Sequence, residues 1–383
     1  MSSNNSMLSA EALRRALSIR DLTDQAEGPH AMQRVVGEVV EALRAEWGCP
    51  VRVHRTSPVV SVADNYDRLH YPADAVTRDE RYSRYVCEGA LLRSQTSAMI
   101  PPLLRALARD PHRPADVLLA CPGLVYRRDC IDRLHSGEPH QMDLWRIRRG
   151  PPLGTADLER MIHRVVQAAL PGRIHRVQQT AHPYTTGGLQ IDVEAGGEWV
   201  EIGECGLALP ALLSESGVPV PGTSGLAMGL GLDRVLMLRK GLDDIRLLRS
   251  QDPRVAGQML DLEPWRPVSA MPPVRRDLSL ALPEDETAEE LGDRVRAALG
   301  ARADLVEAVQ VLSETPWAAL PEAARARLGM APGQKNVLVR VVLRSLERTL
   351  TSEECNALRD EVYAALHRGS AWAWASAEPR KAV

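Results

Sequence analysis

The densest group of chemically useful side chains in this sequence lies between Tyr126 and Asp143, in the run YRRDCIDRLHSGEPHQMD. Two adjacent arginines, four acids, two histidines and a glutamine share these eighteen residues. Arginine forks suit phosphate oxygens, and Gln141 and Asp143 offer oxygen acceptors to an ammonium group. The run therefore predicts a site that holds a polyphosphate together with a zwitterion. The competing interpretation is a charged hairpin on the surface.

Three further segments accompany this run in a fixed order: DNYDRLHYPADAVTRDERYSRYVCEGALLRSQTSA (64–98), HPYTTGGLQIDVEAGGEWVEIGECG (182–206) and SGLAMGLGLDRVLMLRKGLDDIRLLR (224–249). Together the four blocks, spread over roughly residues 20–255, resemble the phenylalanine–tRNA ligase branch of class II aminoacyl-tRNA synthetases. The Tyr126–Asp143 run is similar to motif 2 of that family, an antiparallel hairpin, and the last block is similar to motif 3. The segments 273–283 and 341–354 resemble the ends of the family's small anticodon-binding domain. The whole chain resembles the single-chain mitochondrial form, or a divergent paralogue of it.

The resemblance implies ATP-dependent activation of an amino acid, with Mg²⁺ as the cofactor. Arg127 matches the motif 2 arginine, which would bind the α-phosphate and the incoming carboxylate. Arg234 matches the motif 3 arginine, which would lie against adenine and reach the terminal phosphate. His135 matches a histidine near the γ-phosphate. The competing interpretation of either arginine is a surface salt bridge.

Further residues of the nucleotide site follow from the same match. Glu201 is the first candidate to help hold magnesium on the phosphates, and Asp129 is the second; each is equally interpretable as a structural carboxylate. Pro139 stands where the family has a phenylalanine that stacks on adenine, so ATP binding there is weaker or depends on Arg234 alone. His140 is interpreted as a structural turn residue.

The amino group of the substrate would be held by Gln141, Asp143 and Ser97. The chain departs from the family at two of these positions, because Asp143 replaces glutamate and Gln95 replaces histidine. An acid that is one methylene shorter places its acceptor oxygen more than ~1 Å away from the family's position, which matters for a charge-assisted hydrogen bond.

The side-chain pocket also departs from the family. Ala227 keeps the small residue expected at the far end of a ring pocket, whereas His182 and Tyr184 replace two phenylalanines with rings that carry polar edges. A buried polar edge needs a partner, so one interpretation is a substituted or heteroaromatic substrate. The other is a phenylalanine pocket in which the Tyr184 hydroxyl points to solvent. Glu204 replaces a glycine, and either projects into the pocket or faces solvent.

The bulk composition is that of a globular protein with one large and one small domain in 383 residues. The formal net charge of −3 gives no global basic field, and phenylalanine is absent. Six scattered cysteines without a CxxC pattern favour reduced thiols in the cytoplasm and argue against a zinc site. No apolar run is long enough to span a membrane. The missing phenylalanine fits a ligase that must be translated when charged phenylalanine tRNA is scarce, or a changed substrate.

The order of patterns predicts an α+β protein: a class II synthetase antiparallel sheet flanked by helices, then a ferredoxin-like βαββαβ domain. Residues 1–20 are a polar lead-in, 21–263 the catalytic domain, 264–273 a Pro-rich linker and 274–383 the anticodon-binding domain. We expect helices at 29–47, 101–109, 288–299 and 353–367. We expect strands at 118–120, 144–147, 189–193, 199–202, 275–282, 305–312 and 336–344, with a weak last strand in AWAWA. Residues 229–240 read as a strand running into a helix.

The leading functional prediction is activation of an aromatic amino acid, most simply phenylalanine, and its transfer to tRNA. The second is a paralogue that loads another acid or another acceptor. The third is an inactive RNA-binding or regulatory module, which Pro139 and the slightly acidic C-terminal domain favour. The retained arginines oppose that third interpretation. The predicted partners are an amino acid and tRNA, and the predicted state is a monomer or a homodimer.

Overall fold

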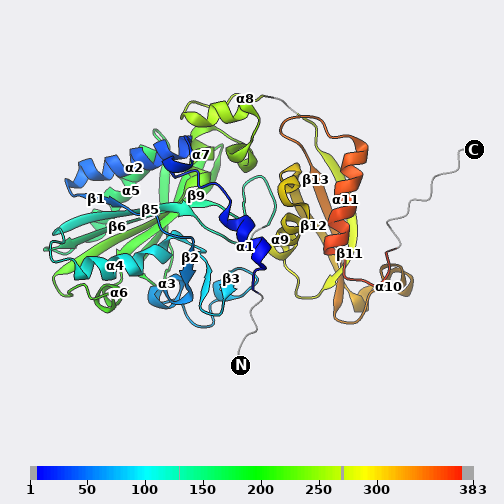
Figure 1. The fold of residues 1–383 in the computed structure, drawn as a ribbon, viewed down its shortest axis with the longest axis horizontal. Coiled ribbons are helices and arrows are strands. Elements are labelled where there is room, and N and C mark those ends of the chain that lie inside the picture. The colour runs from blue at the N-terminus through cyan, green and yellow to red at the C-terminus, as the bar shows by residue number, and fades with distance from the viewer. Residues whose placement is uncertain (1–6, 129, 269–270, 373–383) are drawn as a thin grey trace, which may run out of the picture. The chain divides into compact units, whose positions relative to one another are not determined.

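The computed structural model describes residues 7–128, 130–268 and 271–372. The protein is α+β, as the sequence predicts, and its contacts divide it into two units (Figure 1). The first unit comprises Met1–Arg127 and Glu138–Arg266, and the second comprises Arg128–Gly137 and Pro267–Val383. Residues 128–137, expected within the catalytic domain, therefore belong by their contacts to the second unit.

The first unit is built on a seven-stranded sheet with the order β1-β5-β6-β10-β9-β8-β7. Every neighbouring pair is antiparallel except β1 with β5, which is parallel. The strands are β1 (Val51–Val53), β5 (Asp116–Leu124), β6 (His140–Arg149), β7 (His175–Gln179), β8 (Thr185–Ala195), β9 (Glu198–Ala208) and β10 (Thr223–Gly231). The glycine pair Gly196–Gly197 joins β8 to β9, and both glycines have positive φ.

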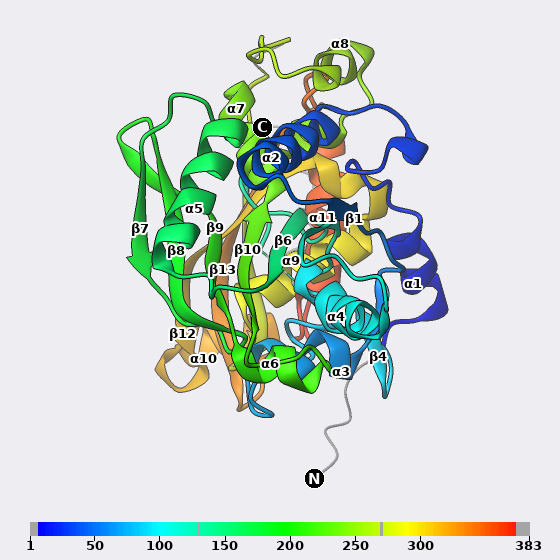
Figure 2. The same ribbon diagram turned by 90° about the vertical axis from the view of Figure 1, so that its left-hand side faces the viewer.

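Helices cover both faces of this sheet. On one face α2 (Ala31–Trp47) packs on α5 (Thr155–Ala169) and α7 (Leu232–Lys240), and α4 (Ile100–Arg109) lies on the other (Figures 1 and 2). Helix α2 forms because its apolar residues recur every three or four positions, and it ends at Gly48, whose φ of 63° favours glycine. The helices hold the central strands between two apolar layers.

The remaining elements of the first unit surround the large sheet. A small antiparallel sheet has the order β2-β4-β3, and β2 contacts helix α3. These elements are β2 (Val59–Ser61), β3 (Arg84–Cys87), β4 (Ala90–Leu92), α1 (Ala10–Leu17), α3 (Val62–Asn65), α6 (Pro210–Glu215) and α8 (Pro253–Ala256).

The second unit has an antiparallel sheet with the order β11-β13-β12. Two of its helices begin with capping boxes, Thr287 with Glu290 and Thr351 with Glu354. The elements are β11 (Val274–Pro283), α9 (Ala288–Leu299), β12 (Val306–Pro316), α10 (Glu322–Leu328), β13 (Gln334–Leu343) and α11 (Ser352–Leu366). The expected last strand lies mostly outside the described residues, and the two described positions, Ala371 and Trp372, are not in a strand.

Two general expectations concern cysteines and membranes. The six cysteines all lie in the described part of the chain, and none forms a disulfide. Among the described residues, every helix is too short or too polar to cross a lipid bilayer.

Candidate active site

The floor of the candidate site is one face of the central strands β6, β10 and β9. Side chains alternate between the two faces of a strand, so Gln141, Asp143 and Trp145 share one face of β6. The residues directly opposite on β10 carry at most a methyl group: Gly231, Gly229 and Ala227. The polar groups of β6 therefore stand beside an open strip of backbone.

Glycine occurs around this floor for two different structural reasons. A Cβ atom on Gly203 would lie 2.2 Å from the carbonyl oxygen of Gly229, and one on Gly206 would lie 2.7 Å from Cβ of Thr185. Close packing therefore requires both glycines of β9. A Cβ atom on Gly229 would come no closer than 3.7 Å, to Oδ1 of Asp143. Packing does not require Gly229, and its missing side chain leaves room above the floor.

Asp143 is the buried carboxylate at the centre of the site. Thr96 donates to Oδ1 at 2.7 Å, and the indole of Trp145 donates to Oδ2 at 3.0 Å. Burial raises the pKa of the Asp143 carboxyl, although bonds from Thr96, Trp145 and Ser97 oppose the shift. Asp143 is thus positioned by protein donors and lies next to Ser97, the other residue predicted with it to hold the ammonium group.

An aromatic wall stands next to this carboxylate. The ring of Tyr184 lies 6.1 Å from Trp145, nearly parallel to it, and 6.2 Å from Tyr71. Ala227 belongs to the same apolar cluster. The hydroxyl of Tyr184 is 3.5 Å from Oγ of Ser97, so it faces the ammonium site, in contrast to the interpretation that it points to solvent.

Gln95 and Gln141 flank this wall. The hydroxyl of Tyr71 donates to Oε1 of Gln95 at 2.9 Å, and Gln95 in turn donates to the carbonyl of Asn65 at 3.0 Å. Oε1 of Gln141 lies 3.4 Å from the amide nitrogen of Thr96. The amide oxygens are therefore oriented by neighbours before any substrate arrives.

A hydrogen-bonded pair, His182 and Glu204, lies beside Tyr184. Nε2 of His182 lies 2.6 Å from Oε2 of Glu204, and the His182 ring is 5.6 Å from Tyr184. The side chain of His182 is 15% exposed and that of Glu204 is 35% exposed. Glu204 therefore turns towards the pocket residues rather than fully into solvent, and satisfies the polar edge of His182.

The two predicted arginines lie in the first unit with the predicted metal ligand. Nε of Arg127 donates to the carbonyl of Ser94 at 2.8 Å, and Arg234 donates to the carbonyl of Glu201 at 2.9 Å. Burial and repulsion from Glu204 raise the pKa of the Glu201 carboxyl, and both arginines oppose that shift. Arg127, Arg234 and Glu201 are therefore close enough to act on one another electrostatically.

A buried pair, His140 and Asp233, connects the segment that resembles motif 2 with the segment that resembles motif 3. His140 has no exposed surface, and its Nδ1 lies 3.1 Å from Oδ1 of Asp233 while its backbone amide donates to Oδ2. Burial raises and His140 lowers the pKa of Asp233, with a net lowering. The predicted structural role of His140 agrees with this placement. The neighbouring Pro139 accepts a backbone hydrogen bond from Val125 at 2.9 Å.

The segment 128–137 carries two other predicted residues. Asp129 lies outside the described residues. His135 belongs to the second unit, where its Nδ1 is 2.6 Å from Oδ2 of Asp132. Burial opposes ionisation of Asp132, but hydrogen bonds from His135 and Leu134 outweigh it and lower the pKa of Asp132 to about 2.

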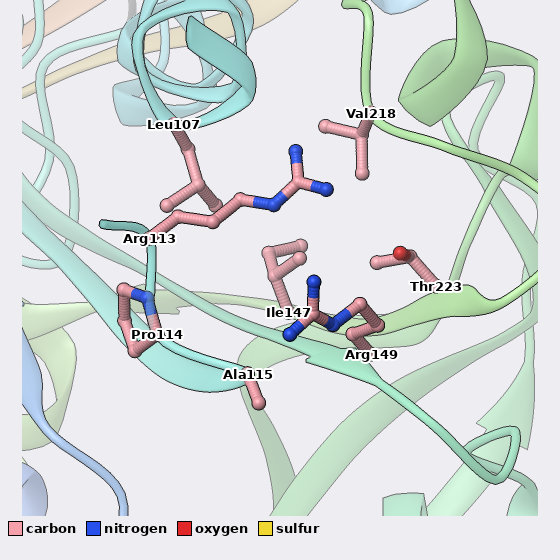
Figure 3. Close-up of a pocket in the computed structure, with 8 residues that line it drawn as sticks. All are labelled: Leu107, Arg113, Pro114, Ala115, Ile147, Arg149, Val218 and Thr223. Carbon is pink, nitrogen blue, oxygen red and sulfur yellow. The ribbon is translucent and has the colours of Figure 1, made fainter. Parts of the chain in front are cut away.

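Two other concavities of the first unit lie apart from the predicted residues. One, of about 390 Å³, is large enough for a small ligand and is lined by segments 20–30 and 248–260. The other, drawn in Figure 3, lies between Arg113 and Arg149 and measures about 10 Å³, the space of roughly one water molecule. None of the predicted site residues that the structure describes lines either concavity.

The structure adds three site residues to those predicted from the sequence: Tyr71, Thr96 and Trp145. Two of them had a signal in the sequence. Trp145 follows Asp143 by two positions and so shares its strand face, and Thr96 lies between Gln95 and Ser97. No sequence pattern indicated Tyr71, because only the fold brings this residue to the sheet.

The sequence of the chain matches two known families. The model described as "tRNA synthetases class II core domain (F)" matches residues 18–259, well over half of the chain. The chain belongs to the class II aminoacyl-tRNA synthetases. In this synthetase, residues 269–371 match the "Ferredoxin-fold anticodon binding domain".

Curated relatives of this class II synthetase carry phenylalanine–tRNA ligase names. The alpha subunit of Prochlorococcus marinus (strain MIT 9313) is 34% identical over 51% of this chain and 56% of that protein. The chloroplastic/mitochondrial enzyme of Arabidopsis thaliana is 28% identical over 80% of this chain and 68% of that protein. This chain thus spans little more than half the length of the Prochlorococcus relative. A pyrrolysyl tRNA synthetase structure, Desulfitobacterium hafniense PylSc, aligns at 17% identity over 59% of this chain and 75% of that chain, with a TM-score of 0.44.

Proposed function

We propose that this synthetase activates an aromatic amino acid, most simply phenylalanine, with ATP and transfers it to tRNA. The observation that carries the proposal is the shared sheet face, on which Asp143 stands between Gln141 and Trp145. Asp143, the predicted acceptor for the ammonium group, is bonded to the indole of Trp145, and that ring stacks on Tyr184. The names of the relatives support the same substrate.

In the first step a carboxylate oxygen of the amino acid attacks the α-phosphorus of ATP, and the bond to pyrophosphate breaks. This displacement needs positioning and charge neutralisation more than acid–base chemistry. Arg127, oriented by its bond to Ser94, would bind the α-phosphate and the carboxylate. Arg234, which donates to the carbonyl of Glu201, would lie against adenine.

Magnesium fits the residues of this site. Burial and the nearby Glu204 raise the pKa of the Glu201 carboxyl, so its ionised form would gain from more positive charge than Arg127 and Arg234 supply. A divalent cation supplies that charge and prefers carboxylate oxygen. Glu201 would hold it, and the ion would neutralise the phosphate oxygens.

In the second step a hydroxyl of the terminal tRNA ribose attacks the acyl carbonyl, and AMP leaves. The match to an anticodon-binding domain supports tRNA as the acceptor. The cytoplasm is the proposed location, which agrees with six cysteines outside any disulfide.

A second candidate function is activation of a different acid. The His182–Glu204 pair favours it, because a pocket for a plain phenyl ring has no use for an imidazole and a carboxylate. A ring with a hydrogen-bond donor would satisfy the pair.

The test is ATP–pyrophosphate exchange with the twenty standard amino acids and ring-substituted phenylalanines, followed by acylation of tRNA with the active acid. Exchange confined to phenylalanine supports the first function. A higher kcat/KM for a ring bearing a donor, reversed in His182→Phe/Glu204→Gly, supports the second. Exchange with none of these acids contradicts both.

A further inference from the structure

Three side chains of metal-binding type lie together in the second unit. Cys130, Asp132 and His135 fall within six consecutive residues, and one ligand atom of each lies within 4.8 Å of the other two. A thiolate, a carboxylate oxygen and an imidazole nitrogen are all ordinary zinc ligands. The steps proposed above use neither Cys130 nor Asp132, so amino-acid activation does not account for this cluster.

Asp132 is the centre of the cluster. Its Oδ1 accepts the backbone amides of Leu134 at 2.7 Å and His135 at 2.8 Å. Its Oδ2 lies 3.6 Å from Sγ of Cys130 and 2.6 Å from Nδ1 of His135. One oxygen therefore orients the carboxylate through the backbone, while the other is directed at the two remaining ligand atoms. Such bonds to the ligand itself are what fix a metal site in place.

The backbone beneath the cluster is also held within the second unit. The carbonyl of Cys130 accepts Arg296 at 2.6 Å, and the carbonyl of Ile131 accepts the amide of Val309 at 2.9 Å. The side chain of Ile131 is 7% exposed and belongs to the apolar core of this unit. Cys130 and Asp132 thus flank an anchored residue, which lowers the entropy lost when they bind an ion.

Two of the nearby arginines have carboxylate partners. Arg128 lies 3.6 Å from Asp293, and Arg133 lies 4.0 Å from Glu307. These carboxylates reduce the repulsion that the two arginines would exert on a cation. A thiolate and a carboxylate would also neutralise the two charges of a zinc ion.

We propose that Cys130, Asp132 and His135 bind one Zn²⁺ ion. With ordinary bond lengths, tetrahedral zinc separates sulfur from oxygen by about 3.6 Å and nitrogen from oxygen by about 3.4 Å. The first separation is already present, and the second requires Nδ1 and Oδ2 to part by about 0.8 Å as the ion replaces the proton they share. Water or a substrate oxygen completes the four ligands. This zinc site does not depend on the activity proposed above.

Magnesium and calcium do not fit this cluster, because both prefer oxygen ligands. The alternative is a cluster of hydrogen bonds alone. The two possibilities differ in the role of the Cys130 sulfur. In a hydrogen-bond cluster the sulfur is only a weak partner, whereas in a metal site it is a ligand.

The test uses the full-length protein, freed of metal by a chelator and then titrated with Co²⁺. Cobalt bound by a thiolate gives a sulfur-to-metal charge-transfer band, which is independent of ATP and amino acids. We expect one Co²⁺ per chain with this band and its loss on addition of equimolar Zn²⁺. Cys130→Ser should remove the band, and His135→Gln should weaken binding at least tenfold.

The matched control is Cys87→Ser, which removes an exposed thiol of the first unit and should leave the band unchanged. Circular dichroism checks that every variant is folded. A wild-type protein without the band, or a band that persists in Cys130→Ser, would overturn the zinc site. A band lost in Cys87→Ser would overturn it too, by assigning the metal to other ligands.

Discussion

The amino-acid end and the phosphate end of the candidate site are built in different ways. At the amino-acid end, Asp143 stands on a central strand and both of its oxygens accept protein hydrogen bonds. At the predicted phosphate end, Arg127 and Arg234 donate to backbone carbonyls. Strand register fixes the first end, whereas side-chain and loop contacts fix the second.

Two aspartates, Asp143 on the central sheet and Asp132 in a loop of the second unit, have opposite pKa shifts. Burial raises the pKa of Asp143, whereas hydrogen bonds overcome burial and lower the pKa of Asp132 to about 2. The sheet therefore tolerates a carboxylate whose charge is costly, as substrate-binding sites often do. The loop keeps a carboxylate whose charge holds the loop together.

The largest effect is expected at the phosphate end. Arg127→Ala should lower the rate of pyrophosphate exchange by about 10² to 10³-fold, the cost of removing one positioned charge donor, without changing the circular dichroism spectrum. The matched control is Arg128→Ala, which removes a guanidinium 3.6 Å from Asp293 and should retain exchange within a few-fold. If exchange persisted in Arg127→Ala, the motif 2 assignment would be wrong.

The next effect tests whether the buried carboxylate both supports the sheet and binds the ammonium group. Asp143→Ala should lower the free energy of unfolding of the first unit by about 2 to 3 kcal/mol, because Thr96 and Trp145 lose their acceptor. Asp143→Asn keeps an acceptor oxygen, so it should lose less stability and still raise KM for the amino acid. Urea unfolding and exchange kinetics measure the two effects. An unchanged KM in Asp143→Asn would remove Asp143 from the ammonium site.

A smaller loss of activity is expected when a methyl group is added to the glycine-lined floor of the site. Gly229→Ala places a methyl group 3.7 Å from Oδ1 of Asp143, where it would crowd the substrate ammonium and lower kcat/KM for the amino acid about tenfold, or about 1.4 kcal/mol. Gly37→Ala on α2, with no atom within 4 Å of the added methyl, is the control. It should raise stability slightly and leave kinetics unchanged. Equal kinetics in the two variants would show that the floor does not touch the substrate.

The smallest effect concerns pH at the loop. The lowered pKa of Asp132 contributes stability above its ordinary value of 3.8, and that contribution is lost as the pH falls towards about 2. The side chain is 38% exposed, so solvent screening limits the change to about 1 kcal/mol or less. Thermal unfolding of the wild type and Asp132→Asn between pH 4 and pH 2 measures it. Parallel curves for the two proteins would contradict the role of Asp132 in holding the loop.

Patterns in the sequence predicted the regular elements closely where the periodicity is strong. The helix predicted at 288–299 coincides with α9, and the strand predicted at 144–147 lies inside the longer β6. Helix α5 and the small sheet were not predicted. The short strands of that sheet pair with each other rather than follow an alternating pattern, so local sequence carries little signal for them.

For the site, the residue types were readable from the sequence, but the strand predicted at 144–147 did not include Gln141 and Asp143, which lie on β6. The orientation of Tyr184 and the approach of Glu204 to His182 were not readable, because both depend on the register of β8 with β9. The cluster of Cys130, Asp132 and His135 has no paired cysteine or histidine spacing of the kind that marks common zinc sites in a sequence.

The sequence by itself determined the family, the α+β class, the order of the elements and the residue types of the site. Periodicity and short motifs are local, so they survive without knowledge of distant contacts. Only the tertiary structure decided which open strip of glycines faces Asp143, which rings form the wall and to which unit residues 128–137 belong. Those outcomes depend on packing between residues far apart in the chain, where burial and hydrogen-bond satisfaction select one arrangement among many.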